Sequence, residues 1–164
     1  VAVILSSIGI SVATEHLDFR LVDNNKMAEL GGEERRDQRG FTDYRQYSQV
    51  FGLFKDRHLS VYILYGMPRL ECIDVLAHEL THAWLFSHGR TKTAPQLCEG
   101  SCNYASLLTL KQFPGPESDY ITNNMLSGPD MVYGEGLRRV KSWVEDVGIA
   151  AWLEYLKKRD KNPW

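Results

Sequence analysis

The chain has 164 residues, of which 43% are hydrophobic and 24% are charged, a composition typical of an ordinary globular protein. Its formal net charge of −2 lacks the basic excess that nucleic acid or an anionic membrane surface would require. No apolar run approaches the length of a bilayer span, so we expect neither a nucleic-acid partner nor a membrane partner.

The first residues, VAVILSSIGI, are apolar, but they lack the basic start and small-residue cleavage site of a signal peptide. We therefore expect a cytoplasmic location. The chain begins with Val1 rather than methionine, which indicates a protein trimmed at its N-terminus. Its length suits a single domain over residues 1–164.

The first forty residues predict short elements. Residues 1–8 are typical of the end of a helix that Gly9 terminates, and LDFRLV has the alternation of a strand. The segment DNNKMAEL predicts a short helix with Asp23 or Asn24 as its N-cap. Residues 31–40, GGEERRDQRG, predict a solvated loop, with a regulatory flap as the alternative.

The rest of the chain predicts one strand followed by helices. The segment LSVYILYG is rich in β-branched and aromatic residues and is stopped by Gly66 and Pro68, so we expect a strand there. Apolar spacing, proline and glycine then predict five helices, over residues 69–88, 93–113, 117–126, 129–147 and 149–158. Strands followed by helices indicate an α+β fold.

The segment HELTH holds the most informative pattern. His78 and His82 are one helical turn apart, so both imidazoles can reach one metal ion. Glu79 is rotated by about 100° from His78, which brings it near a metal-bound water without making it a ligand. This spacing predicts a zinc site with a glutamate general base.

Catalytic zinc needs a third protein ligand. Glu99 lies in the first turn of the next predicted helix, so a helix hairpin can bring it over the histidine pair. The alternative is a first-turn glutamate that is favoured by the helix dipole alone. With Glu99 as ligand, we expect one Zn²⁺ per chain.

Asn103 stands one turn after Glu99, and it is placed to accept the second N–H of His78 or His82. Cys72, Cys98 and Cys102 do not form a structural zinc pattern, and we expect them to be small buried residues in a reducing compartment.

The strand before the metal helix is a candidate substrate platform. An extended peptide can add to a sheet edge through main-chain hydrogen bonds, which aligns its scissile bond. The residues expected to do this are Val61, Tyr62, Ile63, Leu64 and Tyr65. The alternative is an edge strand that binds no guest.

The segments ILYGMPRL, LAHELTHAWL, LCEGSCNYAS and VYGEGLRRVKSWVEDVGI resemble, in this order, the C-terminal zinc peptidase domain of the plant organ-size regulators. These are ubiquitin-activated peptidases with LIM domains upstream. The resemblance implies a gluzincin-like (zincin-like) fold, zinc ligands at His78, His82 and Glu99, and Glu79 as the catalytic residue. The 164 residues contain no LIM cysteines or ubiquitin-interacting segment, so a ubiquitin link rests on the resemblance alone.

Tyr133, in VYGEG, is a candidate for stabilising the oxyanion of a tetrahedral intermediate, because a phenol O–H can donate there. The alternative is a buried tyrosine that is bonded to the backbone. Gly134 and Gly136 indicate that this helix packs closely near the site.

These residues together predict a zinc metallopeptidase that acts on a protein or peptide substrate. The alternative is a non-catalytic, zinc-containing module that binds peptides or proteins. A metal-free helical scaffold would leave HELTH and Glu99 to coincidence.

Overall fold

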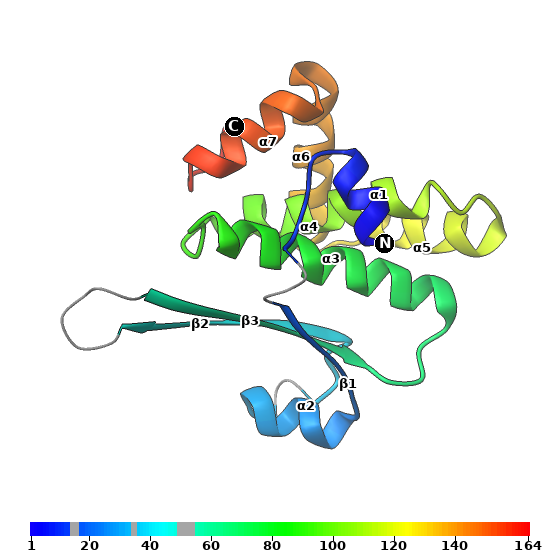
Figure 1. Ribbon diagram of the computed structural model, residues 1–164. Helices are drawn as coiled ribbons and strands as arrows, with labels where there is room; N and C mark the ends of the chain where they lie inside the picture. The colour runs from blue at the N-terminus through cyan, green and yellow to red at the C-terminus, as the bar shows by residue number, and fades with distance from the viewer. Residues whose placement is uncertain (14–16, 34–35, 49–54) are drawn as a thin grey trace.

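The computed structural model describes residues 1–13, 17–33, 36–48 and 55–164. It has an α+β fold with a small mixed sheet and several helices (Figure 1). In chain order the elements are α1 (Ala2–Ser7), β1 (Leu17–Val22), α2 (Asn24–Gly31), β2 (Gly40–Ser48), β3 (Lys55–Leu64), α3 (Arg69–Ser87), α4 (Pro95–Leu110), α5 (Pro116–Ser127), α6 (Gly134–Val147) and α7 (Ile149–Lys158). Within the described parts of the chain, no helix is both long and apolar enough to cross a lipid bilayer.

The sheet has the strand order β1-β3-β2, with β1 parallel and β2 antiparallel to β3. The prediction that residues 61–65 form an edge strand is therefore wrong. The main chain of β3 is paired on both sides, with Val61 opposite Phe19 in β1 and Thr42 in β2. The outer strand that lies beside α3 is β2, which the sequence analysis did not predict.

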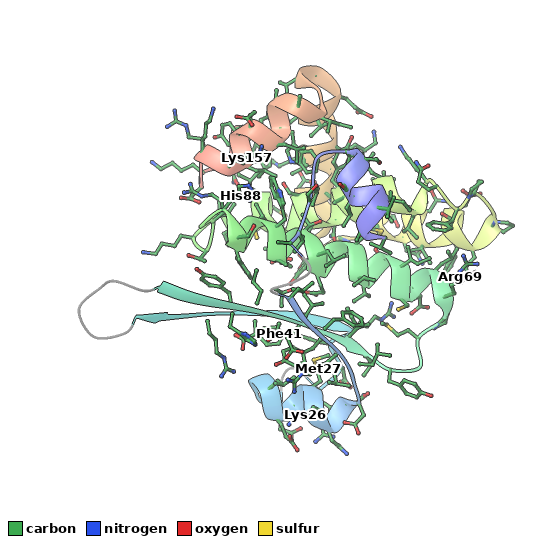
Figure 2. All side chains as sticks on the ribbon, viewed as in Figure 1. Lys26, Met27, Phe41, Arg69, His88 and Lys157 are labelled. Carbon is green, nitrogen blue, oxygen red and sulfur yellow. The ribbon has the colours of Figure 1, made fainter. Side chains whose placement is uncertain are left out.

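Side-chain alternation gives the sheet two different faces. Leu59, Val61 and Ile63 point toward α3 and pack against Ala83. On the other face, Tyr62 packs with Met27 of α2, and Phe41 stacks on Tyr62 with ring centroids 6.2 Å apart. Figure 2 labels Met27 and Phe41 on this α2 side of the sheet. The sheet is thus held between α2 and α3.

A larger apolar core lies on the far side of α3, among the helices (Figure 1). Trp84 of α3 and Trp152 of α7 are its largest fully buried side chains. The indole N–H of Trp152 donates to Ser101 Oγ at 3.1 Å, which satisfies a buried polar group inside α4. Helix α3 therefore lies between the sheet and the helical core, and its residues reach both.

Most predicted helix ends agree with the structure. Asp23 is the N-cap of α2, and its carboxylate accepts the N–H of Lys26. Gly9 and Gly89 follow α1 and α3 with positive φ. The expected start of the sixth helix at Pro129 is wrong, because Asp130 Oδ1 accepts the N–H groups of Val132 and Tyr133 in a turn.

Only part of the segment 31–40 forms the predicted loop. Gly31 ends α2 and Gly40 begins β2, while residues 34–35 lie outside the described residues. Arg36 pairs with Glu33 at the surface. The loop leads the chain directly into the outer strand beside α3.

Candidate functional site

The histidines of HELTH converge as their spacing predicts. His78 and His82 lie on one face of α3, and their Nε2 atoms are 3.0 Å apart. Both side chains are largely buried, with exposed fractions of 16% and 12%. Two imidazole nitrogens therefore point at one position beside α3.

Glu99 of α4 completes a triangle with the two histidines. Its Oε2 lies 3.1 Å from His78 Nε2 and 3.3 Å from His82 Nε2. Two ligands of one tetrahedral zinc ion, each about 2.0–2.1 Å from the metal, are expected to lie about 3.3 Å apart. The three atoms thus fit the ligand set of one metal ion.

Asn103 fixes the ring tautomer of His78. Its Oδ1 lies 2.8 Å from His78 Nδ1, and its Nδ2 donates to the carbonyl oxygen of Tyr133 at 3.3 Å. Because the amide oxygen can only accept, Nδ1 carries the proton and Nε2 of neutral His78 keeps its lone pair. The structure places Asn103 against His78, not His82.

Cys98 takes the corresponding place beside His82. Its Sγ lies 3.6 Å from His82 Nδ1. Hydrogen bonding from Cys102 and then His82 outweighs burial and lowers the pKa of the Cys98 thiol to about 6. The sequence analysis expected Cys98 to be only a small buried residue, and it did not predict this contact with His82.

Two further groups of side chains could hold a metal ion by proximity, His78–His82–Cys102 and His82–Cys98–Glu99. Cys98 faces the Nδ1 side of the His82 ring, away from the Nε2 triangle. Cys102 is fully buried, and burial raises its pKa well above the ordinary value of a thiol, which disfavours the thiolate ligand. The triangle with Glu99 is therefore the better candidate for a metal site.

His82 and Glu99 stabilise each other's charged forms. Burial disfavours the charged forms of His82 and Glu99, but their hydrogen bonds and mutual attraction outweigh burial. The pKa of His82 is raised well above its usual value, and that of Glu99 is lowered to about 2. Glu99 is thus a carboxylate at neutral pH, and a metal bound at this site would displace the proton that the raised pKa keeps on His82.

Glu79 is buried, with 6% of its surface exposed, and is held by the outer strand. Thr42 Oγ1 lies 2.6 Å from Glu79 Oε2 and 3.0 Å from the Glu79 carbonyl oxygen. Gly40, two residues before Thr42 in β2, leaves space for the Glu79 side chain, because a Cβ at Gly40 would lie 2.8 Å from Glu79 Oε1. Strand β2 therefore both admits and orients the carboxylate.

These groups line a cavity of about 410 Å³. Its wall includes the three candidate ligands, Glu79, Asn103 and Tyr133. The Tyr133 ring stacks on His78 with centroids 6.5 Å apart and is 49% exposed. Burial, with the nearby charge of Glu99, raises its pKa, so Tyr133 keeps its O–H proton at neutral pH.

The predicted platform residues are elsewhere. Val61 and Ile63 are fully buried under α3, and Tyr62 faces α2. Tyr65 lies beyond the end of β3 and is 75% exposed. Of the platform residues, none lines the described cavity, because β3 is the central strand.

Comparison with known proteins shows the family of this chain. The family model described as "DA1-like: Protein DA1" matches residues 34–115, which is half of the chain. The chain belongs to the DA1-like family. The DA1-like match spans β2, β3, α3 and α4 and thus contains the metal triangle, Glu79 and Thr42, whereas Tyr133 lies outside it.

Three similar proteins come from plants. Protein DA1 of Arabidopsis thaliana is 27% identical over 132 residues, which cover 63% of this chain and 25% of that protein. Protein DA1-related 1 of the same plant is 40% identical over 52 residues, covering 32% of this chain and 9% of that protein. The LIM domain-containing protein HDR3 of Oryza sativa subsp. japonica is 38% identical over 52 residues, or 32% of this chain and 10% of the relative.

The chain therefore matches at most about a quarter of the length of these DA1-like relatives. No solved structure gives a significant match.

Several cavity residues were missed by the sequence analysis. Thr42 and Gly40 belong to β2, whose aromatic and β-branched residues alternate with polar ones in FTDYRQYS, a strand signal that could have been used. Arg39 and Asp74 also line the cavity. Their places follow from the approach of β2 to the first half of α3.

Proposed function

We propose that this DA1-like chain is a zinc-dependent peptidase with a zincin-like arrangement of its site. The observation that carries the proposal is the convergence of His78, His82 and Glu99 in the same cavity as the buried carboxylate of Glu79. A purely structural zinc site would need no such carboxylate beside it. When bound, zinc supplies the Lewis acidity that activates water and a peptide carbonyl.

The residues of the chain divide the remaining work. Glu79 accepts a proton from the attacking water and passes it to the leaving nitrogen, while Thr42 keeps its carboxylate turned toward the cavity. Asn103 holds His78 in the tautomer whose Nε2 lone pair faces the metal position. Tyr133, protonated and half-exposed at the cavity wall, donates its O–H to the oxyanion of the tetrahedral intermediate.

The substrate is an extended peptide segment of a protein. Among the strands that the structure describes, β2 is the outer one on the side of the cavity, and its outer edge runs next to Glu79. A peptide that pairs with this edge lies across the metal position. The platform is therefore β2, in place of residues 61–65.

Metal content and cleavage together test the proposal. We expect one zinc ion per chain in the parent protein and in Glu79→Gln, measured by mass spectrometry of the metal. Only the parent should cleave an unstructured protein such as casein. His82→Ala should lose its zinc at modest chelator concentrations. As a matched control, Glu117→Gln changes an exposed glutamate of α5 and should keep both zinc and activity.

Equal cleavage by Glu79→Gln and the parent would remove Glu79 as the base. Stoichiometric zinc without any cleavage by the parent would favour the alternative, a zinc-containing module that only binds peptides. A protein that binds no zinc would contradict the metal site itself.

A further inference from the structure

The cavity has two chemically different ends. Gly40, at the start of β2, lies beside Val75, since a Cβ there would be 2.5 Å from Val75 Cγ1. Further along, Tyr44 lies against Phe86, with ring centroids 5.9 Å apart. Strand β2 therefore runs alongside α3 in the same direction.

The end beside Phe86 is aromatic, because Phe86 also stacks on His82 at 5.8 Å. The end beside Val75 is charged, and it is lined by Asp74 and Arg39. Arg39 already has a partner, since its Nη1 lies 3.1 Å from Glu71 Oε2. The charge at this end that lacks a close partner of opposite sign is Asp74.

Among the residues that the structure describes, no lysine, arginine or histidine forms an ion pair with Asp74. Burial raises the pKa of its carboxyl group, although the Ser106 hydroxyl and the charges of His78 and Arg39 act in the opposite direction. A partly buried carboxylate without a paired cation gains from a basic guest that arrives with its own hydrogen-bond donors.

The direction of the peptide follows from the strand. A peptide that pairs antiparallel with the outer edge of β2 runs opposite to it, so its C-terminal half passes Gly40 and Val75. The residue after the scissile bond then faces the end of the cavity that holds Asp74, and the residue before it faces Phe86 and Tyr44.

We propose that Asp74 selects a lysine or arginine side chain in the residue that directly follows the scissile bond. The inference rests on the proposed peptidase function. The aliphatic stem of the basic side chain packs along Val75, and its charged head donates to the carboxylate of Asp74. Asp74 is thus a specificity residue, one helical turn before His78.

Matched peptides test the preference. Three peptides of identical sequence carry phenylalanine before the expected scissile bond and lysine, norleucine or glutamate after it. We expect the zinc-loaded parent to show a kcat/KM for the lysine peptide about tenfold or more above that for norleucine, with glutamate the poorest. Asp74→Asn should bring the lysine-to-norleucine ratio close to one. Asp146→Asn, which changes an exposed aspartate of α6 outside the cavity, should keep the parent ratio.

A binding measurement separates this inference from the proposed function. The same three peptides, carrying a fluorophore, are titrated by anisotropy into Glu79→Gln and into Glu79→Gln/Asp74→Asn. Tighter binding of the lysine peptide that requires Asp74 supports the inference even if the parent cleaves nothing, in which case only the peptidase proposal fails.

Equal kcat/KM values of the parent for the lysine and norleucine peptides, together with equal affinities of Glu79→Gln for them, would overturn the selection by Asp74. The same conclusion would follow from a lysine preference that Asp74→Asn leaves unchanged, or from a preference for lysine before the scissile bond.

Discussion

At the scale of single residues, the site depends on side chains that orient the candidate metal ligand His78 and the candidate base Glu79. His78 is turned by the amide of Asn103, and Glu79 is turned by the hydroxyl of Thr42. Both contacts join residues that are far apart in sequence, 25 and 37 positions respectively. Because folding has already oriented these catalytic groups, the activation free energy of the reaction does not include the cost of orienting them.

Thr42→Val tests this orientation. The substitution keeps the shape of the side chain but removes the hydroxyl that donates to Glu79 Oε2. We expect zinc content to stay the same and kcat to fall about tenfold, since a hydrogen bond to a charged group contributes about 1.5 kcal/mol or more. Metal analysis and steady-state kinetics on casein measure the two quantities.

The control is Thr81→Val, which removes a buried hydroxyl of α3 that donates to the Ala77 carbonyl within the same helix. It should lose little activity. A kcat for Thr42→Val equal to that of the parent would show that Glu79 needs no support from β2.

At the scale of elements, the site depends on how closely three helices approach one another. Gly100 of α4 faces the backbone of Gly136 in α6, and a Cβ at Gly100 would collide with the Gly136 carbonyl group. The close contact of Gly100 is therefore with α6. This contact also keeps the start of α6, with Tyr133, against Asn103 and His78.

Gly100→Ala should therefore destabilise the protein. The added methyl group forces α4 and α6 apart, which we expect to lower the free energy of unfolding by about 1–3 kcal/mol. Urea denaturation monitored by tryptophan fluorescence measures the change.

Gly128→Ala is the matched control, because Gly128 has an ordinary φ of −54° and its Cβ would meet only ordinary contacts from 3.4 Å. It should be neutral or stabilising by up to about 1 kcal/mol. A Gly100→Ala protein as stable as this control would show that the helix contact can relax without cost.

At the scale of the whole molecule, a bound metal would link a helix that packs on the sheet to a helix of the helical core. His78 and His82 come from α3, which packs on the sheet, and Glu99 comes from α4 inside the helical core. A ligand that binds only the folded state stabilises it by about 2.7 kcal/mol when its free concentration is a hundred times its Kd.

Removal of zinc should consequently lower the melting temperature by about 5–10 °C at such a concentration. Differential scanning calorimetry before and after chelation, and again after zinc is returned, measures the shift. His82→Ala provides the comparison, since chelation should leave its melting temperature unchanged. A parent protein with the same melting temperature in zinc and in chelator would contradict a metal link between α3 and α4.

The sequence by itself determined those features that depend on neighbouring residues. Glycine, proline and the Asp23 cap mark the ends of α1, α2, α3 and α5 because capping and backbone freedom act within one turn. The spacing of HELTH put both histidines on one face for the same reason. Glu99 could also be expected over the pair, since a short connection between two helices leaves few other placements.

Only the tertiary structure decided which strand borders the site and which residues support it. The residue pattern of β3 predicts a strand at any position in a sheet. Its central position depends on its pairing with β1 and β2, and local residue patterns do not determine that pairing. Thr42, Gly40 and Asp74 reach the cavity because β2 packs across the first half of α3. Contacts of this kind join distant segments through the packing of a common core, so they exist only once the chain has folded.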